Sequence, residues 1–138
     1  MRVMALDYGT RRTGVAVCDE LGITVRPVET IGGANRLEAV QRAAVLTEEL
    51  EAALVVVGLP LSMDGSEGSA GRRVREFADL LRGLVTVPIE LYDERLTSRE
   101  AEQMLHERGF DRAERKAKAD EWAAMILLKD YLFKHGPK

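Results

Sequence analysis

The chain has 138 residues, of which 46% are hydrophobic and 31% charged, and its formal net charge is −3. This length fits a single domain, residues 1–138, with a sizeable core. No apolar run reaches the roughly 18 residues that span a bilayer, and no signal-peptide pattern opens the chain, so we expect a cytoplasmic protein with no membrane partner. The single cysteine, Cys18, excludes an internal disulfide and a cysteine metal cluster, and we expect it to be buried.

The negative net charge argues mildly against a nucleic-acid partner, because such partners usually bind basic proteins. Basic residues nevertheless cluster locally at Arg11–Arg12, at Arg72, Arg73 and Arg75, and at Arg108, Arg112, Arg115, Lys116 and Lys118. A local basic face or bound divalent cations can reverse the sign of the charge where it matters. For any one of these residues, a solvated helix face is the simpler interpretation.

The first stretch places an acid at the end of a buried strand. Val3 to Leu6 form a continuous apolar run, typical of a central strand covered on both faces, and Asp7 follows it. Ligands of open α/β sheets collect beyond the carboxyl ends of such strands, so Asp7 is a candidate functional residue. An Asx-type turn is the alternative. Thr13 to Val17 resume a strand, with Gly14 where a neighbouring backbone can approach closely.

The remaining elements follow in a regular order. We expect an edge strand at Gly22–Glu29 and then a helix that Asn35 caps and that runs to Glu51, with Leu37, Val40, Ala44 and Leu50 buried. A central parallel strand at Ala53–Val57, a long loop at Gly58–Gly71, a helix at Arg72–Arg82 and a strand at Val85–Tyr92 should follow. The chain should then form a helix at Thr97–Arg108, which Gly109 stops, and a last helix from Asp111 to Lys134. Three antiparallel strands followed by alternating helices and strands indicate an α/β fold with a five-stranded mixed sheet.

Two further acids could join Asp7. Glu94 follows the fifth strand, and Asp120 falls on the apolar stripe of the last helix with Ala123, Ala124, Leu127 and Tyr131. A carboxylate on a buried stripe is costly unless it is paired or bound to a metal. A structural ion pair with an arginine such as Arg95 is the alternative for Asp120.

Three converging carboxylates would select hard cations. Oxygen ligands favour Mg²⁺ or Mn²⁺, and no His/Cys set has zinc spacing. A pair of such ions about 4 Å apart can activate water and neutralise the leaving oxygen in phosphodiester cleavage. The acids therefore predict a metal-dependent hydrolase with a two-metal site.

Four motifs in order resemble those of one family. They are Asp7-Tyr8-Gly9-Thr10 with Arg12-Thr13-Gly14-Val15-Ala16, Val57-Gly58-Leu59-Pro60 with Met63-Asp64-Gly65-Ser66, Asp93-Glu94-Arg95-Leu96-Thr97, and Lys118, Asp120 and Ala123-Ala124. This set closely resembles the YqgF (RuvX) family. The resemblance implies a ribonuclease H-like fold and a nuclease that processes the 5′ end of precursor 16S ribosomal RNA or resolves Holliday junctions.

The resemblance also implies roles for individual residues. Asp7, Glu94 and Asp120 match the family's acidic metal-binding positions and are the expected catalytic residues. Arg12 and Arg95 are candidates for phosphate positioning, because a guanidinium engages two phosphate oxygens at once. Thr10 and Ser66 could donate further hydrogen bonds to the substrate.

Other functions stay open at this stage. The D-x-G-T turn also resembles the phosphate turn of actin-like ATPases and sugar kinases, although 138 residues leave no room for their second lobe. A catalytically idle nucleic-acid-binding module is another alternative. Structured RNA and branched DNA are both possible substrates, and junction resolution would require a homodimer with two-fold symmetry.

Overall fold

The computed structural model describes residues 1–32, 35–62, 64–94, 103, 106–107, 109, 111 and 119–135. Its strands and longer helices are β1 (Val3–Tyr8), β2 (Arg12–Cys18), β3 (Val25–Gly32), α1 (Arg36–Glu49), β4 (Leu54–Leu59), α2 (Ser69–Arg82), β5 (Ile89–Asp93) and α5 (Ala119–His135). None of the helices in the described ranges combines the length and the apolar character needed to cross a membrane.

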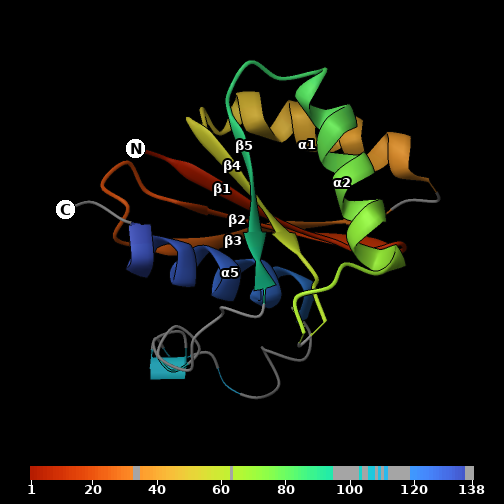
Figure 1. The fold of residues 1–138 in the computed structure, drawn as a ribbon. Helices are drawn as coiled ribbons and strands as arrows, with labels where there is room; N and C mark the ends of the chain where they lie inside the picture. The colour runs from red at the N-terminus through yellow and green to blue at the C-terminus, as the bar shows by residue number, and fades with distance from the viewer. Residues whose placement is uncertain are drawn as a thin grey trace.

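The five strands form one mixed sheet in the order β3-β2-β1-β4-β5 (Figure 1). β1 pairs antiparallel with β2 and parallel with β4, and β5 is parallel to β4. The predicted mixed sheet, with β1 and β4 at its centre and β3 at one edge, is confirmed. The carboxyl ends of β1, β4 and β5 therefore lie along one edge, where the predicted acids follow the strands.

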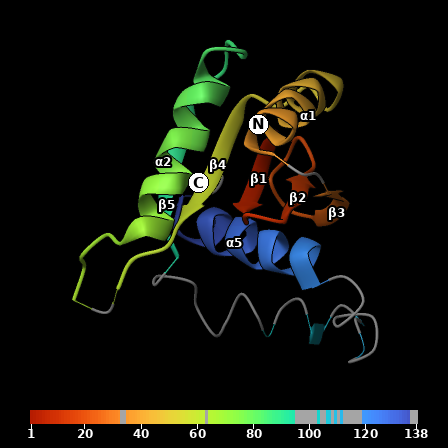
Figure 2. The same cartoon turned by 90° about the vertical axis from the view of Figure 1, so that its right-hand side faces the viewer.

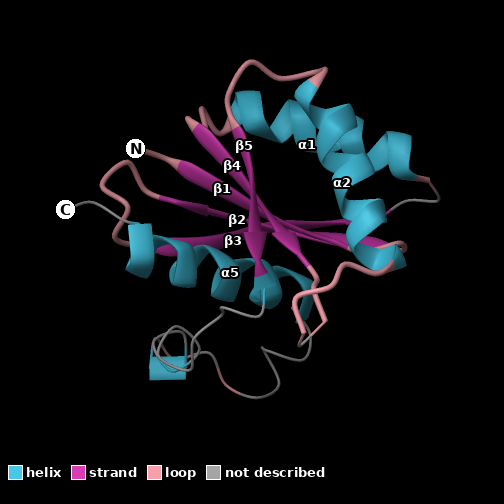
Figure 3. Ribbon diagram, in the orientation of Figure 1, coloured by secondary structure: helices cyan, strands magenta, loops and turns pink. Residues whose placement is uncertain are grey.

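Helices cover both faces of the sheet, with α1 and α2 on one face and α5 on the other (Figures 2 and 3). Alternate residues of each strand supply the two cores, because successive side chains point to opposite faces. Met4 and Leu6 of β1 pack with the core under α1 and α2, whereas Val3 and Ala5 pack under α5. Cys18, at the end of β2, is buried as predicted.

Local hydrogen bonds shift some boundaries from those expected. β3 begins at Val25 instead of Gly22, because Asp19 accepts hydrogen bonds from the Ile23 amide at 2.8 Å and the Thr24 hydroxyl at 3.0 Å. Gly22 belongs to this turn and has a φ of 71°. β5 begins at Ile89 instead of Val85, since the Val85 amide still bonds to the Leu81 carbonyl at the end of α2.

The helices follow the predicted pattern with two corrections. The Asn35 side chain caps α1 by accepting the Glu38 amide at 2.8 Å, as expected. Leu37, predicted to be buried, is 55% exposed because the buried stripe runs instead through Ala39, Val40, Ala43 and Leu46. α2 begins at Ser69, three residues before the predicted start.

The segment between β5 and α5 falls mostly outside the described residues. The helix expected at Thr97–Arg108 and the first turns of the last helix lie there, so they stay predictions. Gly109, the expected stop, has a φ of 90°, a conformation that favours glycine. The described part of the last helix, α5, packs against β1, β2 and β3.

One acid is completely buried between α5 and the sheet. Asp130 accepts hydrogen bonds from the Tyr92 hydroxyl at 2.7 Å and from Lys134 Nζ at 3.0 Å. A buried carboxylate needs such donors, because desolvation without them is costly. The contact therefore joins β5 to α5 at a distance from the acids that follow the strands.

We expect Tyr92→Phe to lower the free energy of unfolding by about 1–2 kcal/mol, because Asp130 then loses one donor in a buried site. Urea denaturation measures the change. Tyr8→Phe is the control, since the Tyr8 hydroxyl has no hydrogen bond with the described residues, and it should cost less than about 0.5 kcal/mol. Equal effects of the two substitutions would contradict this assignment.

Candidate active site

Asp7 lies within β1, in the middle of the sheet. It pairs with Gly14 of the antiparallel neighbour β2. On the other side, the parallel register pairs Leu6 with Val57 of β4, so the following residue of β4, Gly58, lies beside Asp7. Asp7 is therefore part of the strand ladder, and the alternative of a turn cap is not supported.

Asp7 and Glu94 both lie on the face that α5 covers. Asp7 follows Ala5 of the core under α5 by two positions in β1, so it faces the same side. Glu94, just after β5, has its carboxyl group over Gly58, which follows Val56 of the same core by two positions in β4. The sequence prediction that acids at two strand ends meet is confirmed for this pair.

Glycines on both sides of Asp7 make room for the other two acids. A Cβ on Gly14 would overlap the backbone carbonyl of Asp120, and a Cβ on Gly58 would overlap the carboxyl group of Glu94. Only glycine therefore permits this packing. The close approach predicted at Gly14 is confirmed, and the neighbour is the first turn of α5.

The side chains of Asp7 and Glu94 are joined by a hydrogen bond between their carboxyl groups. Burial raises the pKa of Glu94 to about 8, and the bond to Asp7 and its negative charge add to this effect. Burial also raises the pKa of Asp7, although the hydrogen bond from Glu94 opposes the rise, and the charge of Asp120 favours it. Two carboxyl groups that share one proton mark a place where a cation is electrostatically favoured.

Asp120 lies beside this pair, but its carboxylate is held by Arg12. Arg12 Nε is 3.1 Å from Asp120 Oδ2, and the Asp120 side chain is 35% exposed. The predicted stripe is present, since Ala124, Leu127 and Tyr131 are buried, but the Asp120 side chain is only partly buried because it pairs with the exposed Arg12. The alternative of an ion pair is borne out with Arg12 as the partner, whereas Arg95 lies outside the described residues.

An open hollow of about 240 Å³ lies between the acid pair and α5. Its described lining consists of Asp7, Glu94, Ala123, Ile126 and Leu127. Among the described residues, no three His, Cys, Asp or Glu side chains form a ready-made metal cluster. The structure thus brings two of the predicted acids together and leaves the third paired with an arginine next to them.

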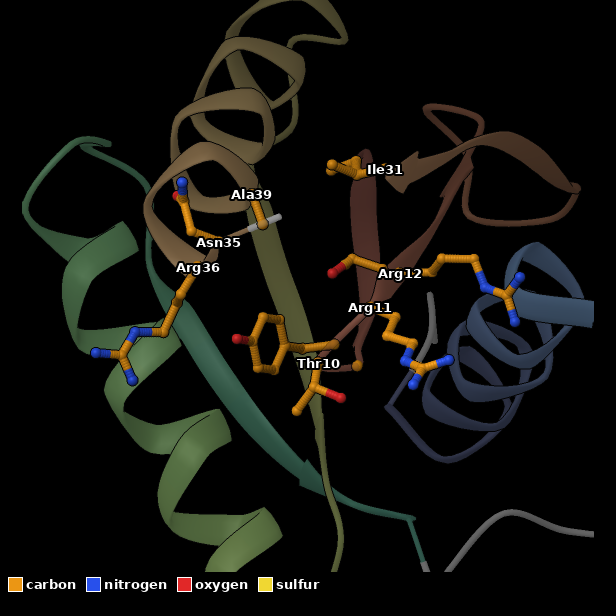
Figure 4. Close-up of a pocket in the computed structure, with 10 residues that line it drawn as sticks. Thr10, Arg11, Arg12, Ile31, Asn35, Arg36 and Ala39 are labelled. Atoms are coloured by element: carbon orange, nitrogen blue, oxygen red, sulfur yellow. The ribbon is translucent and has the colours of Figure 1, made fainter. Parts of the chain in front are cut away.

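Two of the candidate substrate-binding residues, Thr10 and Arg12, lie at the β1–β2 turn. Thr10 lies exposed on that turn, and the Arg12 side chain extends toward α5 (Figure 4). Ser66 lies exposed in the β4–α2 loop, where its amide bonds to Asp64 Oδ1 at 2.9 Å. The structure therefore groups Thr10 and Arg12 on one turn and places Ser66 on a different segment.

Gly58 is a site residue that the sequence analysis missed, because it was assigned to the loop after the apolar run. The signal was available in the sequence, since a glycine directly after a central parallel strand often marks a close approach. Its role becomes visible only when Glu94, 36 positions later, is placed over it.

Comparison with solved structures defines the class of fold. The RuvC resolvase of T. thermophilus in complex with a Holliday junction substrate aligns with a TM-score of 0.69 at 16% identity, covering 97% of this chain and 94% of that one. The fowlpox virus resolvase, in complex with Holliday junction DNA, aligns with a TM-score of 0.60 at 10% identity over 97% and 98% of the two chains. The fold is therefore the ribonuclease H-like fold of these resolvases.

Sequence relatives define the family within this class. The model of the RuvX family, described as Holliday junction resolvase, matches residues 1–134. A relative from Anaeromyxobacter sp. strain K is 40% identical over 99% of this chain and 100% of its own length, and one from Chloroflexus aurantiacus is 43% identical over 94% and 85%. Both carry the name "Putative pre-16S rRNA nuclease". The chain belongs to the RuvX family.

The shared proton predicts an unusual pH dependence of stability in metal-free solution. The pKa of Glu94 is about 8 in the folded chain and near 4.5 when it is unfolded, so the folded state binds more protons between these values. The free energy of unfolding should therefore rise, by about 1–2 kcal/mol after allowance for solvent screening, as the pH falls from 8 to 5.

Thermal unfolding in the presence of a chelator measures this effect, with Glu94→Gln as the comparison. The variant removes the titrating group, so its stability should exceed that of the unmodified chain at pH 8 and approach it at pH 5. Parallel pH profiles for the two proteins would refute the shared proton.

The two glycines beside Asp7 should respond differently to alanine. Gly14→Ala pushes against helix backbone and should lower the free energy of unfolding by more than about 2 kcal/mol, whereas Gly58→Ala pushes only against the Glu94 side chain and should cost less. Gly58→Ala should instead abolish the pH effect described above. Gly32→Ala is the control, because a Cβ there meets nothing within 4 Å. Equal losses of stability for Gly14→Ala and Gly58→Ala would overturn this distinction.

Proposed function

We propose that this chain is a divalent-metal-dependent nuclease that hydrolyses phosphodiester bonds in the cytoplasm, with the 5′ end of precursor 16S ribosomal RNA as its substrate. The observation that carries the proposal is the proton-sharing pair of Asp7 and Glu94 at the carboxyl edge of the sheet. The names of the full-length relatives support the RNA substrate.

The donor set fits Mg²⁺ or Mn²⁺. Asp7 and Glu94 offer only carboxylate oxygens, which hard cations prefer, and a cation would replace the proton that the pair now shares. Asp120 lies close enough to affect the pKa of Asp7. Asp7 and Glu94, together with Asp120 when it leaves Arg12, would hold two ions. When bound, such ions supply an activated water and neutralise the charge on the leaving oxygen.

The chain's own residues position the substrate and exclude competing contacts. Ala123, Ile126 and Leu127 of α5 give the hollow one apolar wall, which limits water around the acids. Arg12 binds either Asp120 or a substrate phosphate. When Arg12 binds the phosphate, Asp120 is released toward Asp7. Thr10 offers a hydroxyl donor on the same turn. For Arg95 and Ser66, contact with the substrate stays a prediction from the sequence.

A four-way DNA junction is the second candidate substrate. The description of the RuvX family model and the fold shared with two resolvases favour it. Resolution of a junction needs two symmetric cuts and hence a homodimer, whereas trimming of an RNA end does not. The pattern of cuts therefore separates the two substrates.

Cleavage by the purified protein tests the proposal. With Mn²⁺ and a labelled RNA carrying the 5′ end of precursor 16S rRNA, Asp7→Asn should reduce the rate by at least about 10²–10³-fold, because it removes the central anionic ligand. Asp79→Asn, an exposed change on α2, should leave the rate unchanged.

Parallel reactions on a labelled four-way junction complete the test. Paired symmetric nicks on the junction, with no RNA cleavage, would replace RNA by branched DNA as the substrate. Full Mn²⁺-dependent turnover by Asp7→Asn would refute the assignment of the site. Calorimetry that detects no Mn²⁺ binding dependent on Asp7 would favour an idle binding module.

A further inference from the structure

A second hollow opens on the other side of the β1–β2 turn. It measures about 170 Å³ and is lined by Tyr8, Gly9 and Thr10 of the turn, Pro60 after β4, and Ala70, Arg73 and Val74 of α2. Arg73 is the one charged residue among these lining residues. The hollow beside Asp7, by contrast, has two acids in its described lining and no cation.

Arg73 differs from the other arginines of α2 because it lines this hollow and forms no ion pair with the described residues. Arg75 pairs with Glu67 at 2.6 Å, and Arg82 pairs with Asp79 at 2.7 Å. Arg73 forms no ion pair with the described part of the chain and is exposed. Arg72 is also exposed and unpaired among those residues, but it does not line the hollow.

The floor of this hollow is rigid. The Tyr8 ring stacks on Phe77 of α2, with ring centroids 4.4 Å apart and planes inclined by 24°. Phe77 is fully buried, so the stack fixes the turn against the helix. The exposed Thr10 hydroxyl and the Arg73 guanidinium therefore lie around a defined surface, which reduces the entropy lost when they bind one anion.

The two hollows are neighbours at the same edge of the sheet. Asp7 and Tyr8 are consecutive in β1, so their side chains point to opposite faces, Asp7 to the α5 side and Tyr8 to the α2 side. The two hollows are thus linked by adjacent residues of β1, since Asp7 lines one and Tyr8 lines the other. From the β1–β2 turn the Arg12 side chain extends toward α5 (Figure 4), so a cation lies on each side of the sheet here although the whole chain carries a net charge of −3.

We propose that the hollow between Thr10 and Arg73 binds a backbone phosphate of the substrate strand next to the cleaved position, after the strand has crossed the β1–β2 turn. This inference rests on the nuclease function proposed above and adds Arg73 as a positioning residue. Arg73 and Thr10 together present several donors to one phosphodiester, and the neighbouring acids disfavour the same phosphate on the α5 side. The contact reads the backbone and carries no sequence preference.

RNA binding in the Asp7→Asn background tests the inference without cleavage. Fluorescence anisotropy with a labelled single-stranded fragment of precursor 16S rRNA, repeated at several KCl concentrations, gives the affinity and its salt dependence. Arg73→Gln should weaken binding about 5- to 10-fold and lower the magnitude of the log K against log[salt] slope by about 0.7, as expected for one lost contact to a single strand. Arg73→Lys should restore most of the slope.

Arg72→Gln is the matched control, because it removes the same charge from the adjacent position on α2. It should change the affinity by less than twofold and leave the slope unchanged. Equal effects of Arg72→Gln and Arg73→Gln would show a general charge effect and overturn the proposal, as would no effect of either. Cleavage by the unmodified chain is measured separately, so loss of this subsite proposal leaves the nuclease assignment intact, whereas absence of both RNA cleavage and RNA binding overturns both.

Discussion

The site depends on how closely other parts of the chain can approach Asp7. Gly14 and Gly58 flank it on the two neighbouring strands, and a side chain at either position would overlap Asp120 or Glu94. Because Gly14 has no Cβ, the backbone of α5 packs directly on β2. Because Gly58 has no Cβ, the carboxyl group of Glu94 packs directly on β4. The fold supplies the rest of the arrangement, because parallel strands bring the carboxyl ends of β1, β4 and β5 to one edge, where Glu94 lies over Gly58 on the same face as Asp7.

The close approach has an electrostatic cost that the chain balances locally. Two carboxyl groups in partial burial retain a proton near neutral pH, and the third is neutralised by Arg12. Burial opposes the charged form of Asp7 and Glu94, so folding alone does not account for two acids at these positions. Asp130 illustrates the opposite case, since its buried carboxylate has donors from Tyr92 and Lys134 and serves to join α5 to β5.

Much of this arrangement could be predicted from the sequence. The apolar runs before Asp7 and Gly58 identified the central strands, and the position of the acids after strands predicted that Asp7 and Glu94 meet. The helical stripe indicated that Asp120 belongs near them, but it did not indicate that the Asp120 side chain is partly exposed, because the pairing with Arg12 depends on the tertiary fold. The contacts of Asp120 with Arg12 and of Asp130 with Tyr92 could not be predicted, since each joins residues 38 or more positions apart through the tertiary fold. Arg73 was one of several arginines in a cluster, and only the placement of α2 beside Tyr8 distinguishes it from Arg72.

The position of α5 after all five strands in the sequence has a consequence for biosynthesis. All five strands lie within residues 3–93, whereas α5 begins at residue 119. The ribosome therefore synthesises the whole sheet before it synthesises α5, the helix that covers the second face. Until α5 emerges, the face formed by Val3, Ala5, Ala16 and Val56 has no helix over it, and Arg12 has no Asp120 to bind. The docking of α5 thus covers the apolar face and brings in Asp120 in the same step. A nascent chain that lacks α5 exposes an apolar sheet surface to chaperones and proteases.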